Sequence, residues 1–168
     1  MQIDMRPVEF ITVGTIGPRG KRMFHLQAGH DDRLVSFTLE KEQAWALSEA
    51  IQEFIEDLDE RLEDETRVEM AALDMDLREP IQPLFRISQM GLGYEEDDGM
   101  IILIAQELLI PEDDEDEDAY EDRAEDSGVV RMWCTREQML ALSLHTMDTV
   151  EAGRPDPKQN GRIAYYWT

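Results

Sequence analysis

The sequence predicts an α+β fold in which one β-β-β-α unit occurs twice, with a pseudo-two-fold relation between the copies. The first observation is a recurring segment: Glu42–Ser48 reads EQAWALS and Glu137–Ser143 reads EQMLALS. The second is that each copy follows a strand-like run and opens an amphipathic segment. Because three strands and one helix leave an apolar face or edge uncovered, the two units are expected to share one core, with mainly antiparallel strand pairing.

Residues 1–64 are predicted to form the first unit. Its strands alternate apolar and polar residues and are separated by glycine-containing turns. The expected strands are Val8–Gly17, Lys21–Ala28 and Leu34–Leu39. A helix then begins near Glu40, because apolar residues recur at three- and four-residue intervals. The expected buried stripe of this helix is Ala44, Leu47, Ile51, Phe54, Leu58 and Leu62.

Residues 65–83 are predicted as a linker with weak helical character, because prolines interrupt its pattern. The second unit occupies residues 84–168. Its expected strands are Leu84–Tyr94, Met100–Ile110 and Val129–Cys134. A helix follows, and its start is sharply marked: Thr135 and Gln138 fit a capping box, in which each side chain bonds the other residue's backbone amide.

A strongly acidic insertion, residues 111–128, separates two strands of the second unit. Residues 112–126 hold eleven carboxylates against one arginine, a net charge of −10. Self-repulsion and the lack of apolar residues predict a disordered loop. Its carboxylate spacing resembles a calcium loop, but Ala119 stands where that loop needs glycine, which disfavours calcium binding. The residues expected to meet a basic partner are Asp113, Asp114, Asp116, Asp118, Glu121 and Asp122.

The whole chain is acidic, with a formal net charge of −23 over 168 residues. Such a field repels nucleic acid and anionic lipid, so direct binding to either is not expected, whereas a basic protein partner is. An acidic proteome in the source organism is an alternative explanation of the same charge. The one cysteine, Cys134, cannot form an internal disulfide, and no leader or 18-residue apolar stretch is evident. These features predict a soluble cytoplasmic protein.

The basic cluster, formed by Arg19, Lys21 and Arg22, is the densest group of cations in the sequence. It lies beside glycines whose backbone amides can bind an oxyanion, and with Arg154 it is the candidate anion site. A phosphate loop is disfavoured because the glycine spacing is wrong and a strand, not a helix, follows. The three histidines match no metal or catalytic motif, so no catalytic residue, metal or cofactor is predicted.

Five motifs follow one another along the chain: Gly14–Gly20, Phe24–Ala28, Leu39–Gln43, Met90–Tyr94 and Thr135–Gln138. Together they resemble the landmarks of one uncharacterised family that is widespread in actinobacteria and sometimes labelled "repeat protein". The resemblance implies no known activity. It does imply a functional link to histidine-phosphatase-like and lipid-kinase-like proteins, which tend to accompany members of the family.

The resemblance extends to the end of the chain, with one departure. Many members of that family carry cysteines and a histidine, spaced like a zinc knuckle, between a Gly-Arg-Pro and an Asn-Gly. Here Gly153–Pro155 runs through to Asn160 and Gly161 without a cysteine. Thiolate zinc coordination needs about four ligands, so zinc is not expected in this chain.

Two functional hypotheses remain open. In the first, the chain is a non-enzymatic interaction module whose acidic surface meets a basic partner. In the second, it is a phosphate-ligand-binding protein or an enzyme of a phosphate-related pathway, and the basic cluster then lines a pocket with His25, Glu42 or Gln138. Tyr165–Trp167 is a further binding candidate, because three consecutive aromatics at a chain end predict docking into the fold or into a partner.

Overall fold

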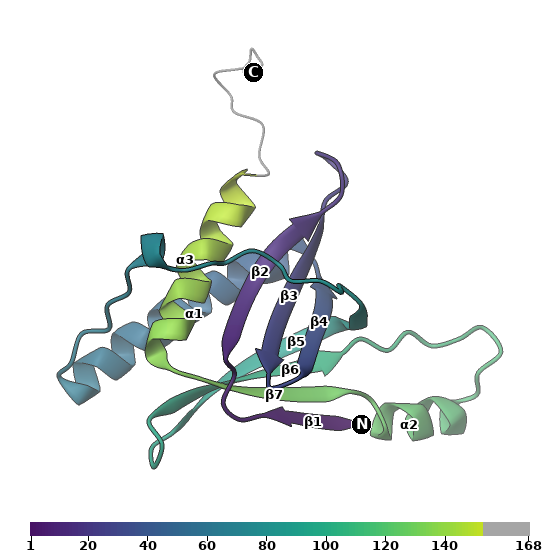
Figure 1. The fold of residues 1–168 in the computed structure, drawn as a ribbon. Helices are drawn as coiled ribbons and strands as arrows, with labels where there is room; N and C mark the ends of the chain where they lie inside the picture. The colour runs from purple at the N-terminus through teal and green to yellow at the C-terminus, as the bar shows by residue number, and fades with distance from the viewer. Residues whose placement is uncertain (153–168) are drawn as a thin grey trace.

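Within residues 1–152, which the computed structural model describes, seven strands form one sheet and three α-helices accompany it (Figure 1). In chain order, the elements are β1 (Gln2–Met5), β2 (Phe10–Ile16), β3 (Met23–His30), β4 (Arg33–Leu39), α1 (Lys41–Leu62), the 3-10 turn η1 (Met70–Ala72), β5 (Pro83–Glu95), β6 (Met100–Glu107), α2 (Glu117–Glu125), β7 (Val129–Cys134) and α3 (Arg136–Ala152). The predicted α+β class is confirmed. Arg154 and Tyr165–Trp167 lie outside the described residues.

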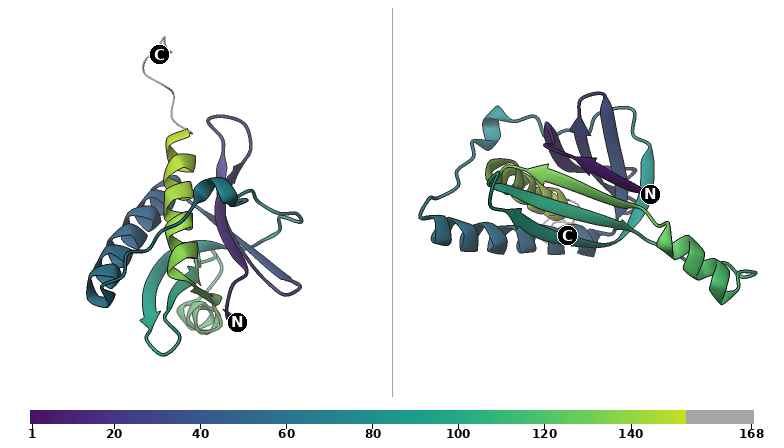
Figure 2. Two further views of the ribbon diagram at one scale, coloured as in Figure 1. Left: turned by 60° about the vertical axis from the view of Figure 1, so that its left-hand side comes forward. Right: turned by 90° about the horizontal axis from the view of Figure 1, so that it is seen from below.

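The strand order across the sheet is β1-β7-β6-β5-β4-β3-β2. The β1/β7 and β4/β5 pairs are parallel, and the other four pairs are antiparallel. Although β1 and β2 lie at opposite ends of this order, only residues 6–9 separate them. In this short connection Val8 N–H donates to the Trp133 carbonyl over 2.8 Å and Glu9 N–H donates to the Gly29 carbonyl over 2.7 Å. The sheet therefore bends until its two ends meet, as Figures 1 and 2 show.

Apolar residues on one face of the sheet, the inner face, form the core. They form three cross-strand pairs between β3 and β4 and three more between β6 and β7. Across β3 and β4 the pairs are Phe24/Leu39, Leu26/Phe37 and Ala28/Val35, and across β6 and β7 they are Ile101/Cys134, Leu103/Met132 and Ala105/Val130. All of these side chains are buried. The predicted alternation of these strands places the apolar residues on this inner face, as period-two patterning requires.

Helices α1 and α3 pack against each other over the inner face. The buried α1 residues are Ala44, Leu47, Ser48, Ile51, Ile55 and Leu58. The predicted stripe is therefore wrong at two positions: Phe54 is only half-buried and Leu62 is 42% exposed. Contact with α3 explains the difference, because it places Ser48 and Ile55 inside and turns Phe54 toward β5.

Part of the linker, residues 73–80, lies across the outer face of β2 and β3. We call this segment the strap. Thr12 Oγ1 donates to the Met75 carbonyl over 2.6 Å, and Gln27 bonds both backbone groups of Arg78. Leu77 lies so close to Gly14 that a Cβ on Gly14 would be 2.6 Å from Leu77 Cγ. The strap therefore shields polar side chains of the sheet that water would otherwise reach.

The structure differs from the sequence prediction at two further elements, β1 and α2. Strand β1 was not predicted, because a four-residue alternation is too short to stand out and its partner β7 lies more than 120 residues further along the chain. The insertion at 111–128, predicted to be disordered, contains helix α2. Asp116 caps α2 by accepting the Ala119 amide at 2.7 Å, and carboxylates in the first turn favour the positive end of the helix dipole.

Candidate functional site

The basic cluster does not form a convergent anion site among the described residues. Arg19 and Lys21 are exposed on the β2–β3 turn, which needs glycine at position 17 because φ there is 110°. Only Arg22 lines a cavity, of about 230 Å³, and that cavity also contains Glu40 and Lys41. A carboxylate in so small a space opposes the binding of a second anion.

The three residues expected to line a pocket with the basic cluster, His25, Glu42 and Gln138, do not line this cavity. His25 is buried, and its ring nitrogen Nδ1 lies 3.1 Å from the Met23 carbonyl. Gln138 bonds the Val8 carbonyl on the far side of the fold at 3.0 Å. Glu42 is exposed on α1. The structure therefore does not bring together the pocket that the phosphate hypothesis requires.

The insertion forms a projecting acidic limb, which we define as residues 112–126. It stands at the end of the sheet away from α1 and α3 (Figure 1). Its one cation, Arg123, is held internally: Arg123 Nη2 lies 2.7 Å from Glu115 Oε1 and also donates to the Ile110 carbonyl at 2.8 Å. The hydrogen bond from Arg123 lowers the pKa of Glu115, so this pair stays ionised and bound.

All six residues predicted for partner binding are exposed on this limb. They are Asp113, Asp114, Asp116, Asp118, Glu121 and Asp122. Asp116 has a second role, because its side chain is the N-cap of α2. Arg123 is already occupied by Glu115, and the N-terminal ammonium lies 3.2 Å from Asp126, so these six carboxylates form no ion pair among the described residues and present a negative surface.

A second concave feature was not predicted from the sequence. We call it the groove: it lies between α1 from Gln43 to Asp57 and Ser88–Leu92 of β5, with a volume of about 580 Å³. A neighbouring hollow of about 630 Å³ shares Phe54 and Asp57 with it and reaches Tyr94. Together they extend along one side of α1.

The groove has an apolar lining and an acidic rim. Phe54, Met90 and Leu92 line it as half-buried apolar side chains. Glu53 and Asp57 supply exposed carboxylates along the helix. The sequence signal that could have revealed it is Phe54, an aromatic residue that falls beside, not within, the buried face of α1.

The groove is open because α1 packs less closely against β5 than α3 packs against β2. Val13 of β2 and Leu92 of β5 each pair with an inner leucine, Leu26 and Leu103. Val13 is fully buried, yet Leu92 stays half-exposed. The upper end is fixed, because Gln43 Nε2 donates to two β5 carbonyls at 3.1 Å.

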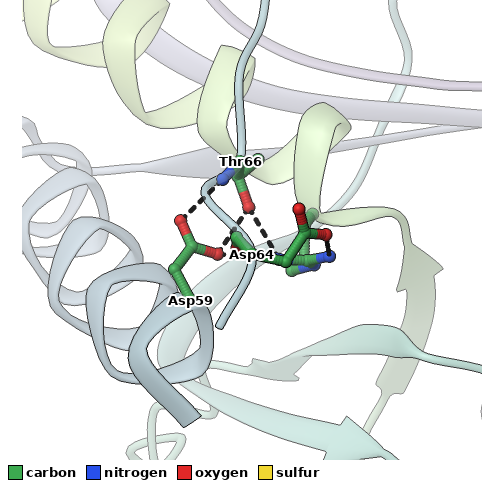
Figure 3. A network of polar contacts seen from close by, with 4 residues as sticks. Asp59, Asp64 and Thr66 are labelled. Carbon is green, nitrogen blue, oxygen red and sulfur yellow. Dashed lines mark hydrogen bonds and ion pairs between the residues drawn. The ribbon is translucent and has the colours of Figure 1, made fainter. Parts of the chain in front are cut away.

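A polar network joins the end of α1 to the start of α3 (Figure 3). Arg136 Nη1 lies 2.8 Å from Asp59 Oδ1, and Arg136 Nη2 lies 2.8 Å from Asp64 Oδ2. Thr66 donates its amide and its hydroxyl to the two carboxylate oxygens of Asp59 at 2.8 and 2.6 Å. Every oxygen of Asp59 is thus occupied, which is typical of a structural clamp.

The clamp also sets the ionisation of its carboxylate. Partial burial pushes the pKa of Asp59 up, but hydrogen bonds from Thr66 and Arg136 outweigh burial, so the pKa lies below its ordinary value. Asp59 therefore remains an anion at neutral pH and does not act as a proton donor.

Two further groups carry side chains that can bind metals or react, the Glu9/His30/Asp31 cluster and Cys134, but their contacts are those of structural residues. Glu9, His30 and Asp31 place one ligand atom each within 4.8 Å of one another. Their atoms are already used at the β3–β4 turn, where Asp31 N–H donates to Glu9 and His30 Nδ1 contacts the Pro7 carbonyl. Cys134 is fully buried, and burial raises the pKa of its thiol far above neutral pH, as expected for a small core residue.

Comparison with known proteins identifies the family. A family model described as "Protein of unknown function (DUF3090)" matches residues 3–161. The chain belongs to the DUF3090 family. No curated protein and no solved structure matches it. Within residues 1–152 of this DUF3090 chain, no helix has the length and apolar character needed to span a lipid bilayer.

Proposed function

We propose that this DUF3090 chain is a non-enzymatic interaction module that binds a basic protein through its acidic limb. One observation carries the proposal: the limb projects from the fold with its carboxylates exposed, while its only cation is neutralised within the limb by Glu115. Complementary charge of this density accelerates association with a positively charged surface. Nucleic acids and anionic membranes carry the same sign of charge as the limb and are unfavourable partners.

The family resemblance suggests where to search for the partner. A histidine-phosphatase-like or lipid-kinase-like protein from the same organism is the first candidate, provided that it has a basic surface. We place the encounter in the cytoplasm, because the only cysteine is unpaired and buried.

The test compares two variants with equal charge change. The first converts the six limb residues predicted for partner binding to amides: Asp113→Asn, Asp114→Asn, Asp116→Asn, Asp118→Asn, Glu121→Gln and Asp122→Asn. Asparagine at position 116 still caps α2, so the helix is retained. The matched control converts six exposed carboxylates elsewhere: Glu69→Gln, Asp76→Asn, Glu79→Gln, Glu137→Gln, Asp148→Asn and Glu151→Gln.

Affinity for a purified candidate partner is measured at low and high salt. The limb variant is expected to bind at least about tenfold more weakly at low salt, and added salt should weaken the wild type and the control alike. Equal losses in both variants would mean that net charge, and not the limb, governs binding. Unchanged binding by the limb variant rejects the proposal.

The alternative is binding of a phosphorylated ligand at the basic cluster. One observation favours it: Arg22 and Lys41 line the same cavity. Glu40 in that cavity, and its ion pair with Arg86, work against it. Calorimetric titration with inorganic phosphate and with a phosphorylated nucleoside tests this alternative, and saturable binding that is lost in Arg22→Gln would favour it over the interaction module.

We also infer that the scaffold arose by duplication of one β-β-β-α unit. The correspondence of the two cap glutamines supports this. Gln43 accepts the Glu40 amide and donates to carbonyls of β5, whereas Gln138 accepts the Thr135 amide and donates to the Val8 carbonyl. Each cap glutamine thus binds backbone of the other half: Gln43 binds β5, and Gln138 binds the connection that precedes β2.

A further inference from the structure

We propose that residues 153–168 of this chain dock in the groove between α1 and β5. This inference goes beyond the proposed function, because it concerns a different surface and a partner within the same chain. The occupant is identified by its chemistry, by its starting point and by its length.

Charge complementarity favours this occupant. Residues 153–168 contain Arg154, Lys158 and Arg162 against one aspartate, a net charge of +2 in a chain whose total is −23. The groove and its neighbouring hollow carry three carboxylates along α1, Glu53, Asp57 and Glu60, against one cation, Arg61. The most cationic end of the chain therefore has a carboxylate-rimmed surface available on its own fold.

Apolar complementarity points the same way. Near its end the segment contains Tyr165-Tyr166-Trp167, and each such side chain can bury about 150–250 Å², which makes aromatic residues dominant in docking energetics. Phe54, Met90 and Leu92 line the groove and remain half-exposed. Leu103 of β6, which pairs with Leu92, also lines the groove, so the aromatic side chains would meet a continuous apolar surface there.

The geometry of the helices brings the segment to the groove. Arg136 at the start of α3 meets Asp59 near the end of α1, and Ser143 meets Ser48 further along. The two helices therefore run roughly antiparallel, so the end of α3 lies on the same side of their crossing as the first turn of α1. Gln43 in that first turn is also the upper end of the groove.

The length of the segment is sufficient. Trp167 is the fifteenth residue after Ala152, and an extended chain of that length spans about 50 Å. The groove side of α1, from Gln43 to Arg61, is about 27 Å long at 1.5 Å per residue. The segment can therefore pass round the start of α1 and place its aromatic residues in the groove.

The segment that follows α1 provides a precedent. After α1, the strap lies across β2 and β3 and presses Leu77 against Gly14. In the proposed arrangement, the segment that follows α3 covers β5 in the other half of the molecule, with aromatic side chains over Met90 and Leu92.

Engineered cysteine pairs in the full-length chain test the proposal. Ala50→Cys with Tyr166→Cys places one thiol in the groove and one in the aromatic segment. Glu137→Cys with Tyr166→Cys is the control, since Glu137 is also exposed on a helix but lies outside the groove. Native Cys134 does not interfere, because it is fully buried.

Docking predicts that the groove pair closes an intramolecular disulfide at least about tenfold faster than the control pair, because docking raises the local thiol concentration. Adding Glu53→Lys to the groove pair should slow closure, whereas Glu49→Lys, an exposed charge reversal on α1 outside the groove lining, should not. Equal rates for the two pairs would overturn the proposal. Disulfide-linked dimers would overturn it as well, by assigning the segment to a second copy. Neither outcome depends on the acidic limb.

Discussion

Ser48 donates its hydroxyl hydrogen to the backbone carbonyl of Ser143 over 2.7 Å, at the point where α1 contacts α3. Both residues are fully buried, and they occupy the same place in the two recurring segments EQAWALS and EQMLALS. A small side chain at this contact lets the two helix backbones approach closely. The recurring segment is therefore the place where the two halves of the molecule join.

Enlarging this contact should separate the helices. Ser48→Leu inserts a branched side chain where there is no space, and we expect the free energy of unfolding to fall by about 1–3 kcal/mol. Ser48→Ala removes only the hydrogen bond and should cost about 1 kcal/mol. Chemical denaturation measures both values. Glu49→Leu, an exposed neighbour, is the control, and an equal loss in that variant would show that α1 as a whole, not this contact, is sensitive.

The Asp59 clamp should make stability depend on pH in the acid range. Because the pKa of Asp59 is lowered in the folded protein, the stabilisation is complete above the ordinary aspartate pKa of about 4 and is lost as the pH falls through the folded value. Asp59→Asn should therefore cost about 1–2 kcal/mol near neutral pH, a figure reduced because water reaches the pair. The difference from the wild type should vanish in acid.

Denaturation midpoints measured at several pH values check this prediction. Glu60→Gln, an exposed residue beside the clamp, provides the matched control. A wild-type minus Asp59→Asn difference that stays constant from neutral pH into acid would contradict the assigned role of the carboxylate.

Gln27 should fasten the strap to the sheet. Its side chain is fully buried, donates to the Arg78 carbonyl and accepts the Arg78 amide, each at 2.7 Å. Gln27→Met keeps the volume but leaves both backbone groups of Arg78 without these bonds, at a cost of about 1–3 kcal/mol. Hydrogen exchange of the Arg78 amide should accelerate, whereas Gln82→Met, an exposed change in the same linker, should leave it unchanged.

Thr146 offers a stabilising substitution. Its hydroxyl is buried and, among residues 1–152, has no hydrogen-bond partner. Thr146→Val has the same shape without the unsatisfied oxygen, so the free energy of unfolding should rise by about 1 kcal/mol. Thr149→Val is the control, because Thr149 Oγ1 donates to the His145 carbonyl at 2.8 Å and its loss should give no gain. Thermal unfolding of the two variants decides between these outcomes.

Local pattern was sufficient for most of the secondary structure. The predicted strand Val129–Cys134 agrees with β7 residue for residue, and the Thr135/Gln138 capping box is confirmed by reciprocal bonds of 3.0 and 2.8 Å. These features depend on alternation and on residues three apart in sequence, so they can be read locally. Helix α2 was missed because charge content outweighed its cap in the prediction, although Asp116 was present as a signal.

The candidate sites were predicted unevenly for the same reason. The acidic limb is a property of composition, so its carboxylates could be located from the sequence alone. The groove depends on the distance between α1 and β5, which no spacing within either element encodes. The sequence pattern predicted Phe54 as a core residue. In the structure the face of α1 that contacts α3 excludes it, and Phe54 lies toward β5.

The sequence by itself determined the strands β2 to β7, the helices α1 and α3, the acidic composition and the helix cap at Thr135, because each of these depends on neighbours along the chain. Only the tertiary structure decided that β1 pairs with β7, that the strap covers β2 and β3, and that α1 stands off from β5 to leave a groove. These features arise from packing between segments far apart in sequence, where the fit of side chains, and not their periodicity, sets the distances.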